Sequence, residues 1–382
     1  MLTNQKNKFS LDSSHVYLNC AYMSPLLQAV ERAGIDGMLM KRNPWRVTAD
    51  DFFKKAEELR AEFAKLVSAP KPAQIVIVPS VSYGIANVVR NLKVGASHEV
   101  VVVGEQFPSN VYPWQRLCGQ AGCKLVTVNA PDGEAQRGER WNVRILESIT
   151  PLTRVVAMGH VHWTDGTLFD LQMIRKRTQE VGAKLIIDGT QSVGAYPFDV
   201  SSIQPDALIC AGYKWLLGPY SLGLAYYSEE FNEGTPVEEN WINRLYSEDF
   251  SSLVNYQQHY QPGALRYEVG EHSNFILVPM LLAALRQLSE WTPEAIQQYC
   301  HAITKDAIAT LTNHGYWVEQ DEHRGQHLFG IRLNNQRRLQ VAKQRLRDHQ
   351  ISVSYRSDVI RVSPHVYNSN EDLYALVDAL LF

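Results

Sequence analysis

The stretch AKLIIDGTQSVGAYPFDVSSIQPDALICAGYKWLL, residues 183–217, places polar side chains directly after two short apolar runs. The first run ends at Asp188, and the second, residues 207–211, is followed closely by Lys214. Apolar runs of this length are typical of strands that are buried on both faces of a parallel sheet. Because open α/β sheets bind ligands beyond the carboxyl ends of their strands, we predict one ligand site containing Asp188, Gln191 and Lys214.

The side chains of this predicted site suit an aromatic aldehyde cofactor. Lys214 can form a Schiff base with the aldehyde, and Asp188 can pair with a protonated pyridine nitrogen. Either residue alone would mean little, since a strand-end Asp is more often a helix cap and an exposed Lys is usually a solvated charge. Their joint placement at the ends of two buried strands indicates a functional site.

Length and composition describe a globular chain without a charged face for large polyanions. The 382 residues are 45% hydrophobic and 20% charged, and they suffice for two or three domains or for one large domain with a satellite. A net charge of −3 gives no basic field for nucleic acid or membranes, and no run approaches a membrane span. The five cysteines show no paired spacing, so we expect a cytoplasmic protein.

Short apolar runs alternate with helical patterns through the first two thirds of the chain, which predicts a parallel α/β sheet. A first helix is expected over 26–40, a second after Thr48, and others over 85–92 and 171–181, whereas 137–140 reads as a polar connection. The predicted strands are 15–18, 74–78, 100–103, 124–128, 154–158, 185–188, 207–211 and 224–227.

The last third of the chain has a different pattern, in which helices come first and short strands follow. We expect loops near an interface over 229–262, helices over 278–291, 293–314, 337–349 and 371–381, and strands over 316–319, 328–333, 351–355 and 359–363. The predicted domains are an N-terminal arm (1–14), a large domain (15–262) and a small α+β C-terminal domain (263–382).

The Asp-Gly-x-Gln run at 188–191, with a lysine 26 residues after the Asp (214 − 188), resembles the class V aminotransferases. This branch of the fold-type I enzymes includes cysteine desulfurases, kynureninases and isopenicillin N epimerase-like proteins. The resemblance covers nearly the whole chain. It implies a mostly parallel seven-stranded sheet flanked by helices, a smaller α+β C-terminal domain, and pyridoxal 5′-phosphate (PLP) as the cofactor.

The turn at 79–84 is similar to the family's Gly-Thr-Thr turn, which holds the PLP phosphate. A small-residue turn at a helix start offers free N–H groups and the positive end of the helix dipole. The resemblance implies phosphate contacts from the Val81 N–H, from the Ser82 hydroxyl and from Tyr213. The competing interpretations are an ordinary serine N-cap and a buried core tyrosine.

Three further residues are implied to lie beside the PLP ring. The run Phe107-Pro108-Ser109-Asn110-Val111-Tyr112 looks like a kynureninase run in which the aromatic ring stacks on the pyridine, so Phe107 would stack and Asn110 would hydrogen-bond. His162 aligns with a donor near the phenolic oxygen, which Gln191 would also reach. A core aromatic is the alternative for Phe107. His160 and His162 share a strand face but lack a third ligand, so no metal site is predicted.

The resemblance also assigns substrate and partner contacts. Arg361, in a run similar to Arg-x-Ser-x-x-x-Tyr-Asn, would clamp the substrate α-carboxylate, and Asn19 would line the mouth of the site. The run 263–275 resembles an Arg-x-Glu-x-Gly segment that reaches the neighbouring subunit's cofactor, which implies a homodimer with shared sites. Glu271 or His272 stands where desulfurases have Thr; since a carboxylate would repel a phosphate, Ser273 and Asn274 are the better candidates.

These residues predict a PLP-dependent enzyme that acts on an amino acid through a Lys214 Schiff base, with amino transfer favoured as the family's usual reaction. A lyase, an epimerase and a kynureninase-like hydrolase remain open. Desulfuration through a persulfide is disfavoured because no cysteine follows Cys300. A PLP-binding sensor or scaffold without catalysis is the alternative of another class, and a carboxylate clamp at Arg361 argues against it. No sequence pattern identifies the substrate or the amino acceptor.

Overall fold

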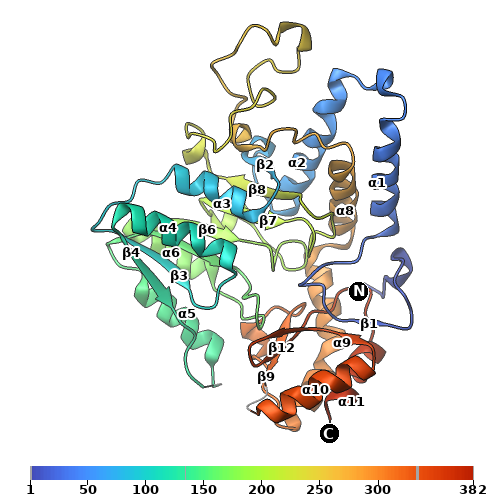
Figure 1. Cartoon of the computed structure of the whole chain (residues 1–382). Helices are drawn as coiled ribbons and strands as arrows, with labels where there is room; N and C mark the ends of the chain where they lie inside the picture. Colours follow the sequence, from blue (N-terminus) through green and yellow to red (C-terminus); the bar gives the residue numbers. More distant parts are fainter. Residues whose placement is uncertain (1, 134, 333–334, 382) are drawn as a thin grey trace.

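The computed structural model describes residues 2–133, 135–332 and 335–381, and its largest sheet contains seven strands. They are Ile75–Val78 (β2), Glu99–Val103 (β3), Lys124–Val128 (β4), Thr153–Gly159 (β5), Lys184–Asp188 (β6), Ala207–Ala211 (β7) and Gly223–Tyr227 (β8). Their order is β2-β8-β7-β6-β5-β3-β4, and only β8 runs antiparallel to its neighbours. The predicted mostly parallel seven-stranded sheet is confirmed (Figure 1).

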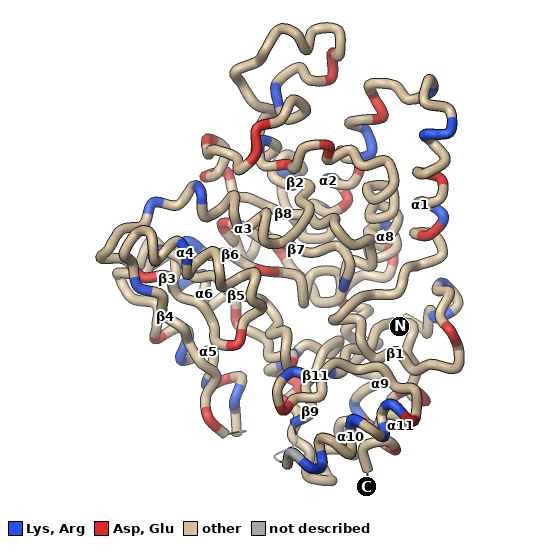
Figure 2. Tube along the Cα trace, in the orientation of Figure 1, with Lys and Arg blue, Asp and Glu red and all other residues tan. Residues whose placement is uncertain are grey.

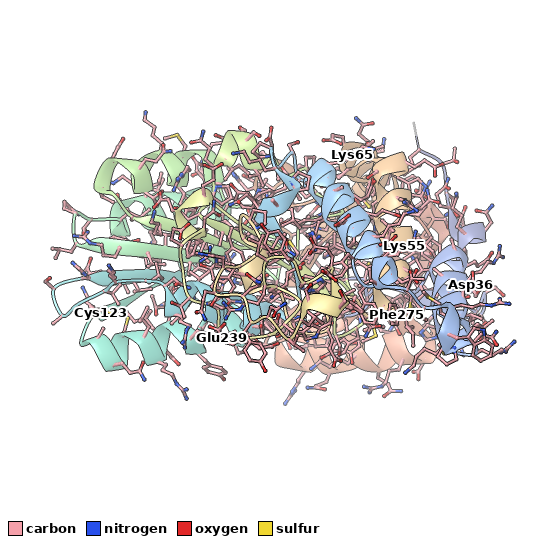
Figure 3. All side chains as sticks on the ribbon, turned by 90° about the horizontal axis from the view of Figure 1, so that it is seen from above. Asp36, Lys55, Lys65, Cys123, Glu239 and Phe275 are labelled. Atoms are coloured by element: carbon pink, nitrogen blue, oxygen red, sulfur yellow. The ribbon has the colours of Figure 1, made fainter. Side chains whose placement is uncertain are left out.

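Helices cover both faces of this sheet because alternate strand residues point to opposite sides. Val100 and Val102 of β3 belong to the apolar core on one face, whereas Val101 and Val103 belong to the core on the other. Figures 1 and 3 show the sheet between these two helical layers. The covering helices are Val81–Arg90 (α3) and Tyr112–Ala121 (α4) on one face, and Arg137–Ser148 (α5) and Leu171–Val181 (α6) on the other.

A smaller α+β layer follows in the C-terminal third. Its three-stranded antiparallel sheet has the order β11-β12-β9. The helices beside it are Pro293–Asn313 (α9), Gln336–Asp348 (α10) and Asn370–Leu380 (α11), and the strands are Phe329–Arg332 (β9), Ser354–Arg356 (β11) and Val359–Val362 (β12).

Two contacts cross the predicted domain boundaries. The short strand Val16–Tyr17 (β1) pairs in parallel with Ile351–Ser352 (β10), so the start of the chain lies on the C-terminal layer. Helix Leu277–Trp291 (α8) packs against Gln28–Met40 (α1) and Lys54–Leu66 (α2), on the side opposite to Cys123 (Figure 3). The domain limits 1–14, 15–262 and 263–382 therefore stay predictions.

Three predictions of secondary structure were wrong. Residues 137–140 start α5, because Trp141 and Ile145, four residues apart, bury a helical stripe that the polar first turn conceals. Residues 316–319 form no strand, and only Trp317 bridges Arg332 there. The predicted strand 351–355 is divided between β10, which pairs with β1, and β11, which pairs with β12. Residue 333, the end of another predicted strand, lies outside the described residues.

Charged residues of both signs are interspersed along the trace (Figure 2). This distribution agrees with the small net charge of −3. Within the described ranges, no helix is long and apolar enough to cross a membrane.

The large sheet is tied to the segment after residue 263 by a buried ion pair. Both Glu268 carboxylate oxygens lie 3.0 Å from Nη1 of Arg60 on α2, and one of them accepts a hydrogen bond from the Ile77 N–H in β2. Nδ1 of His272 lies 3.2 Å from the same carboxylate, and burial lowers the pKa of this imidazole. Glu268 is therefore the acceptor for groups from two other segments, α2 and β2.

We expect Glu268→Ala to lower the free energy of unfolding by about 3–5 kcal/mol, because the Arg60 charge and the Ile77 N–H would lose their buried partner. Urea unfolding of the holoenzyme measures this change. Lys55→Ala is the matched control: it breaks the exposed Lys55–Glu58 pair (3.0 Å) and should cost less than about 1 kcal/mol. Equal effects of the two substitutions would contradict the assigned role of Glu268.

Candidate active site

Eight of the predicted site residues line one cavity of about 360 Å³ at the carboxyl ends of the parallel strands. The segment after β2 and the N-terminus of α3 form one wall, and the ends of β5, β6 and β7 contribute the others. The eight residues are Val81, Ser82, Phe107, His162, Asp188, Gln191, Tyr213 and Lys214. Most of the predicted residues thus lie together, as expected for a ligand site beyond the carboxyl ends of parallel strands.

Lys214, just beyond β7, is almost fully buried in this cavity. Its Nζ lies 5.3 Å from the centre of the Phe107 ring and 5.5 Å from that of Tyr213. Burial, together with the nearby charges of Arg361 and Arg356, lowers the pKa of Lys214 to about 8, and Asp188 acts in the opposite direction. The amine is therefore more readily available as a nucleophile and base than an ordinary lysine.

Asp188 ends β6 and faces the same cavity. Its carboxylate accepts a hydrogen bond from the Thr190 N–H (3.0 Å), and no ion pair joins it to a cationic side chain in the described part of the chain. Burial raises the pKa of this carboxyl, which the Thr190 hydrogen bonds and Lys214 partly offset. A buried carboxylate with room beside it fits a protonated pyridine nitrogen.

The predicted phosphate turn leads from β2 into the N-terminus of α3. The Ser80 hydroxyl accepts the Tyr83 N–H (3.2 Å), so Ser80 caps the helix, and its oxygen lies 2.9 Å from that of Ser82. The N-cap alternative thus applies to Ser80 and leaves the Ser82 hydroxyl at the cavity wall with the Val81 N–H. This start of a ten-residue helix fits an anionic phosphate.

Phe107 is not a core aromatic, because it is 38% exposed and lines the cavity. Its ring meets the Trp163 ring edge to face, with the centres 5.4 Å apart. Its position fits the predicted stacking on a planar ring.

Asn110 is buried but is absent from the cavity wall that the described residues form. Its side-chain oxygen accepts the Trp114 indole N–H (2.9 Å), and its backbone carbonyl accepts the Gln106 amide (3.0 Å). Gln106 itself lines the cavity. Asn110 thus holds Gln106 in place, and a direct contact between Asn110 and a cofactor stays a prediction.

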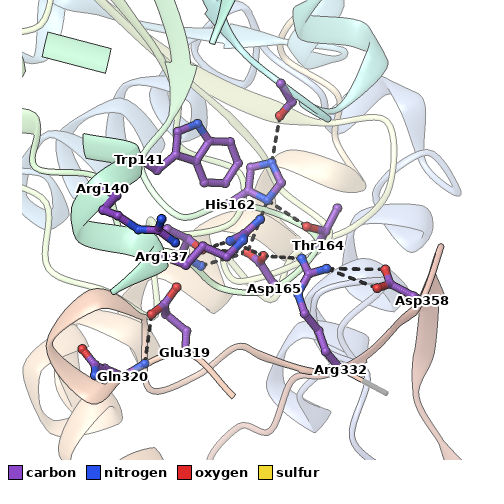
Figure 4. Close-up of polar contacts among 12 residues, drawn as sticks. Arg137, Arg140, Trp141, His162, Thr164, Asp165, Glu319, Gln320, Arg332 and Asp358 are labelled. Atoms are coloured by element: carbon purple, nitrogen blue, oxygen red, sulfur yellow. Dashed lines mark hydrogen bonds and ion pairs between the residues drawn. The ribbon is translucent and has the colours of Figure 1, made fainter. Parts of the chain in front are cut away.

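His162 lines the cavity with both ring nitrogens already engaged (Figure 4). Nε2 donates to the Gly104 carbonyl (3.2 Å), and Nδ1 lies 2.8 Å from the Thr164 hydroxyl and 3.4 Å from Asp165. Two arginines pair with the same Asp165 carboxylate, Arg137 at 2.9 Å and Arg332 at 3.1 Å. A hydrogen bond from His162 to the cofactor would therefore have to replace the contact of one ring nitrogen with Gly104, Thr164 or Asp165.

Gln191 has one amide hydrogen left for a ligand. Its Nε2 donates to the Ala21 carbonyl (3.1 Å), and its side-chain oxygen accepts the Trp215 indole N–H (2.9 Å). These two contacts fix the direction of the amide at the cavity wall.

Arg361 and Asn19 are connected beside the cavity by Ser354. The Arg361 guanidinium donates to the Trp163 carbonyl (2.9 Å) and to the Ser354 hydroxyl (3.2 Å), which in turn donates to the Asn19 side-chain oxygen (2.7 Å). Arg361 is buried, forms no ion pair among the described residues, and has an Nε without a hydrogen-bond partner among them. This cation is suited to a carboxylate ligand.

Ser273 and Asn274 lie apart from the lysine cavity of their own chain. With Glu271 they line a second cavity beside Phe52 and Trp241. The Asn274 side-chain oxygen accepts the N–H groups of Ile276 (3.0 Å) and Leu277 (2.9 Å) at the start of α8. If Ser273 or Asn274 contacts a cofactor phosphate, that phosphate must belong to another subunit.

Several residues of the cavity wall were not predicted from the sequence. Trp163 follows His162 directly, and its position at a strand end was a usable signal that was missed. Gln106 precedes the predicted Phe107. Four more, Thr190, Tyr220, Ser221 and Leu222, follow the Asp188 and Lys214 turns. The remaining unpredicted wall residues are Pro79, Ser80, Ser109, Gly159, Val161 and Ala211.

Comparisons with known proteins agree with this geometry. A family model described as Aminotransferase class-V matches residues 42–376. An uncharacterized aminotransferase of Bacillus subtilis (strain 168) is 27% identical over 371 residues, which cover 96% of this chain and 94% of that protein. A cysteine desulfurase of Escherichia coli (strain SE11) is 29% identical over 266 residues, which cover 68% of this chain and 62% of that protein.

Solved structures share the fold at low sequence identity. A structure of C-DES with glycine covalently linked to the PLP cofactor has a TM-score of 0.85 at 19% identity, covering 99% of both chains. A cysteine desulfurase from Thermococcus onnurineus NA1 has a TM-score of 0.84 at 21% identity, covering 99% of this chain and 97% of that chain.

The fold and the cavity define a fold-type I PLP-dependent enzyme. The chain belongs to the class V aminotransferase family. Its cofactor is PLP, and it acts on an amino acid.

The lowered pKa of Lys214 predicts how the apoenzyme captures PLP. Below about pH 8 the side chain is a protonated ammonium that cannot attack the aldehyde, so the capture rate should rise with pH through a midpoint near pH 8. Stopped-flow absorbance on mixing apoenzyme with PLP measures this rate. Arg361→Met removes a neighbouring positive charge and should move the midpoint upward. A midpoint that is identical in both proteins would contradict the proposed electrostatic cause.

Asp188→Asn should retain PLP but lose activity by about 10- to 100-fold, because a neutral amide replaces a charge-assisted contact with the ring nitrogen. Bound PLP is measured by absorbance and activity by steady-state turnover. Asp170→Asn is the control: Asp170 caps α6 by accepting the Met173 N–H (3.0 Å), and asparagine caps equally well. Full activity of the Asp188 variant would assign ring protonation to another group.

Proposed function

We propose that the protein is an aminotransferase whose proton carrier is Lys214 and whose substrate α-carboxylate is bound by Arg361. The observation that carries this proposal is a buried lysine of lowered pKa that shares one cavity with Asp188 and adjoins a buried arginine without an anionic partner in the described chain. Amino transfer needs one base that would move a proton from the substrate α-carbon to the carbon that carried the cofactor aldehyde, on the other side of the linking nitrogen, and Lys214 suits that role.

The chain's own residues supply binding and proton movement. PLP, when bound, supplies an electron sink for the carbanion at the substrate α-carbon. Asp188 would hold the proton of the ring nitrogen, Phe107 would cover one ring face, and the start of α3 would bind the phosphate. Arg361 would orient the α-carboxylate so that Lys214 Nζ could take the α-proton and deliver it to the carbon that carried the cofactor aldehyde.

The cysteines support amino transfer over desulfuration. A desulfurase that carries sulfur as a persulfide needs an accessible thiolate. All five cysteines are free and buried, and burial raises the pKa of Cys20, Cys210 and Cys300.

The reaction class is tested by incubating the holoenzyme with a panel of amino acids without an acceptor. We expect one class of donor to convert the cofactor stoichiometrically to pyridoxamine 5′-phosphate and to release the matching 2-oxo acid. Chromatography measures both products. Catalytic release of ammonia with pyruvate would instead assign a lyase, and inversion of the α-carbon alone would assign an epimerase. Unchanged cofactor with every amino acid would favour the sensor or scaffold.

Lys214→Ala should abolish turnover, because the proton carrier is lost, while the pocket can still retain PLP non-covalently. The measurement is single-turnover conversion of the bound cofactor by the best donor. Loss of more than about 1,000-fold is expected from removal of a general base that also forms the covalent link. Normal rates would refute the assignment. Lys176→Ala, at an exposed position of α6, is the control.

We also propose a homodimer with shared sites in the cytoplasm. The loop over 241–256 projects from the body (Figure 1). Its exposed large apolar side chains, which include Tyr246, Val254 and Tyr256, support an interface. The second cavity with Ser273 and Asn274 adjoins its base, where Trp241 packs against Phe250. The free cysteines agree with a reducing compartment.

A further inference from the structure

A second arginine, Arg356, lies near Lys214 and has no assigned role in binding the α-carboxylate. It belongs to β11, which pairs with β12 so that Ser354 lies opposite Arg361 and Arg356 lies opposite Val359. Residues directly opposite in an antiparallel pair, and residues two apart in one strand, share a face of the sheet. Arg356 and Arg361 are therefore diagonal neighbours on one face, a relation that spaces residues by about 7–8 Å.

Both guanidinium groups meet the same cavity-lining indole. The Arg356 guanidinium carbon lies 4.9 Å from the centre of the Trp163 ring, and that of Arg361 lies 6.0 Å from it. Trp163 lines the lysine cavity and packs edge to face on Phe107. The two cations therefore flank one wall of the substrate space.

Arg356 lacks an anionic partner among the described residues. Nη1 donates to the Tyr355 carbonyl (2.7 Å), the buried Nε has no hydrogen-bond partner in the described chain, and no ion pair there includes this residue. Burial lowers the pKa of Arg356, and its charge also lowers the pKa of Arg361 and Lys214. Holding cations together without a counter-charge is unfavourable, and an anionic ligand would relieve it.

We propose that Arg356 is a specificity-determining residue that binds an anionic group on the substrate side chain, so that the donor is a dicarboxylic amino acid. This inference rests on the proposed function only for the assignment of the α-carboxylate to Arg361. Two guanidinium groups with Trp163 between them would bind the two ends of one short dianion. A substrate with a neutral side chain would leave Arg356 unpaired.

Binding without chemistry tests the proposal directly. Glutarate and pentanoate have the same chain length and differ in the second carboxylate, and 3-phosphonopropionate offers a different second anion. Titration of the holoenzyme, followed by calorimetry, should give glutarate an affinity about 10- to 100-fold above that of pentanoate. The comparison with 3-phosphonopropionate distinguishes a carboxylate from a phosphorylated side chain: tighter binding of glutarate supports the dicarboxylic class, and tighter binding of the phosphonate overturns it.

Substitution of Arg356 assigns the preference to this residue. Arg356→Gln should reduce glutarate affinity to the level of pentanoate and leave pentanoate affinity unchanged, whereas Arg356→Lys should keep part of the preference. A structural role against Trp163 would instead weaken both ligands equally. Arg347→Gln, an exposed arginine on α10, is the matched control and should keep the full preference. Equal affinities in the unsubstituted enzyme, or an undiminished preference in Arg356→Gln, would overturn the proposal.

Turnover separates this inference from the proposed function. Glutamate should convert the bound cofactor to pyridoxamine 5′-phosphate at least about 10-fold faster than glutamine at equal subsaturating concentration, and Arg356→Gln should remove that difference. A glutarate preference without amino transfer would refute the aminotransferase and retain the role of Arg356. Amino transfer from neutral donors without any preference for dianions would retain the aminotransferase and refute the role of Arg356.

Discussion

The parallel pairing of β6 with β5 and β7 is the constraint on which the active site depends. Asp188 is the last residue of β6 and lies in register with Gly159 of β5 and Ile209 of β7. Because all three strands run in the same direction, their ends meet at one edge, and the segments that leave them carry His162, Gln191 and Lys214 to one cavity. A slip of one residue in β6 would turn the Asp188 side chain to the opposite face of the sheet.

Charge balance is the second organising feature. The cavity region gathers Lys214, Arg361 and Arg356 around a single buried carboxylate, Asp188, and the arginines have no ion-pair partner in the part of the chain that the structure describes. Such an excess of buried cations costs free energy in the ligand-free protein. The start of α3 adds the positive end of a helix dipole. This excess of positive charge suits anions, which supports the proposed binding of the cofactor phosphate and of substrate carboxylates.

The sequence predicted which residues near the strand ends gather at the cavity, and it did not predict the hydrogen bonds that these residues make within the protein. Asp188, Lys214 and Phe107 come directly after buried apolar runs, so the topology alone assigns them to the cavity. His162 and Asn110 were predicted to face the cofactor, and their polar atoms are engaged by protein groups. Thr164 and Trp114 are local partners, two and four residues away, whereas the Gly104 carbonyl comes from a segment 58 residues away. The helix α5 was missed because its apolar stripe is visible only against the sheet. Arg356 was missed because its relation to Arg361 depends on the register of a hairpin.

The arginines that we propose to bind substrate also lower the basicity of Lys214, in addition to the effect of its burial. In the ligand-free site the charge of Arg361 and, to a smaller extent, that of Arg356 disfavour the ammonium form and lower the pKa of Lys214. This favours the neutral amine that must attack the cofactor aldehyde. Once a carboxylate occupies Arg361, its negative charge offsets the guanidinium, and the pKa of the released lysine rises again. The lysine is then the stronger base at the step in which it must take the α-proton. Substrate binding and proton transfer would thus be coupled through one electrostatic interaction.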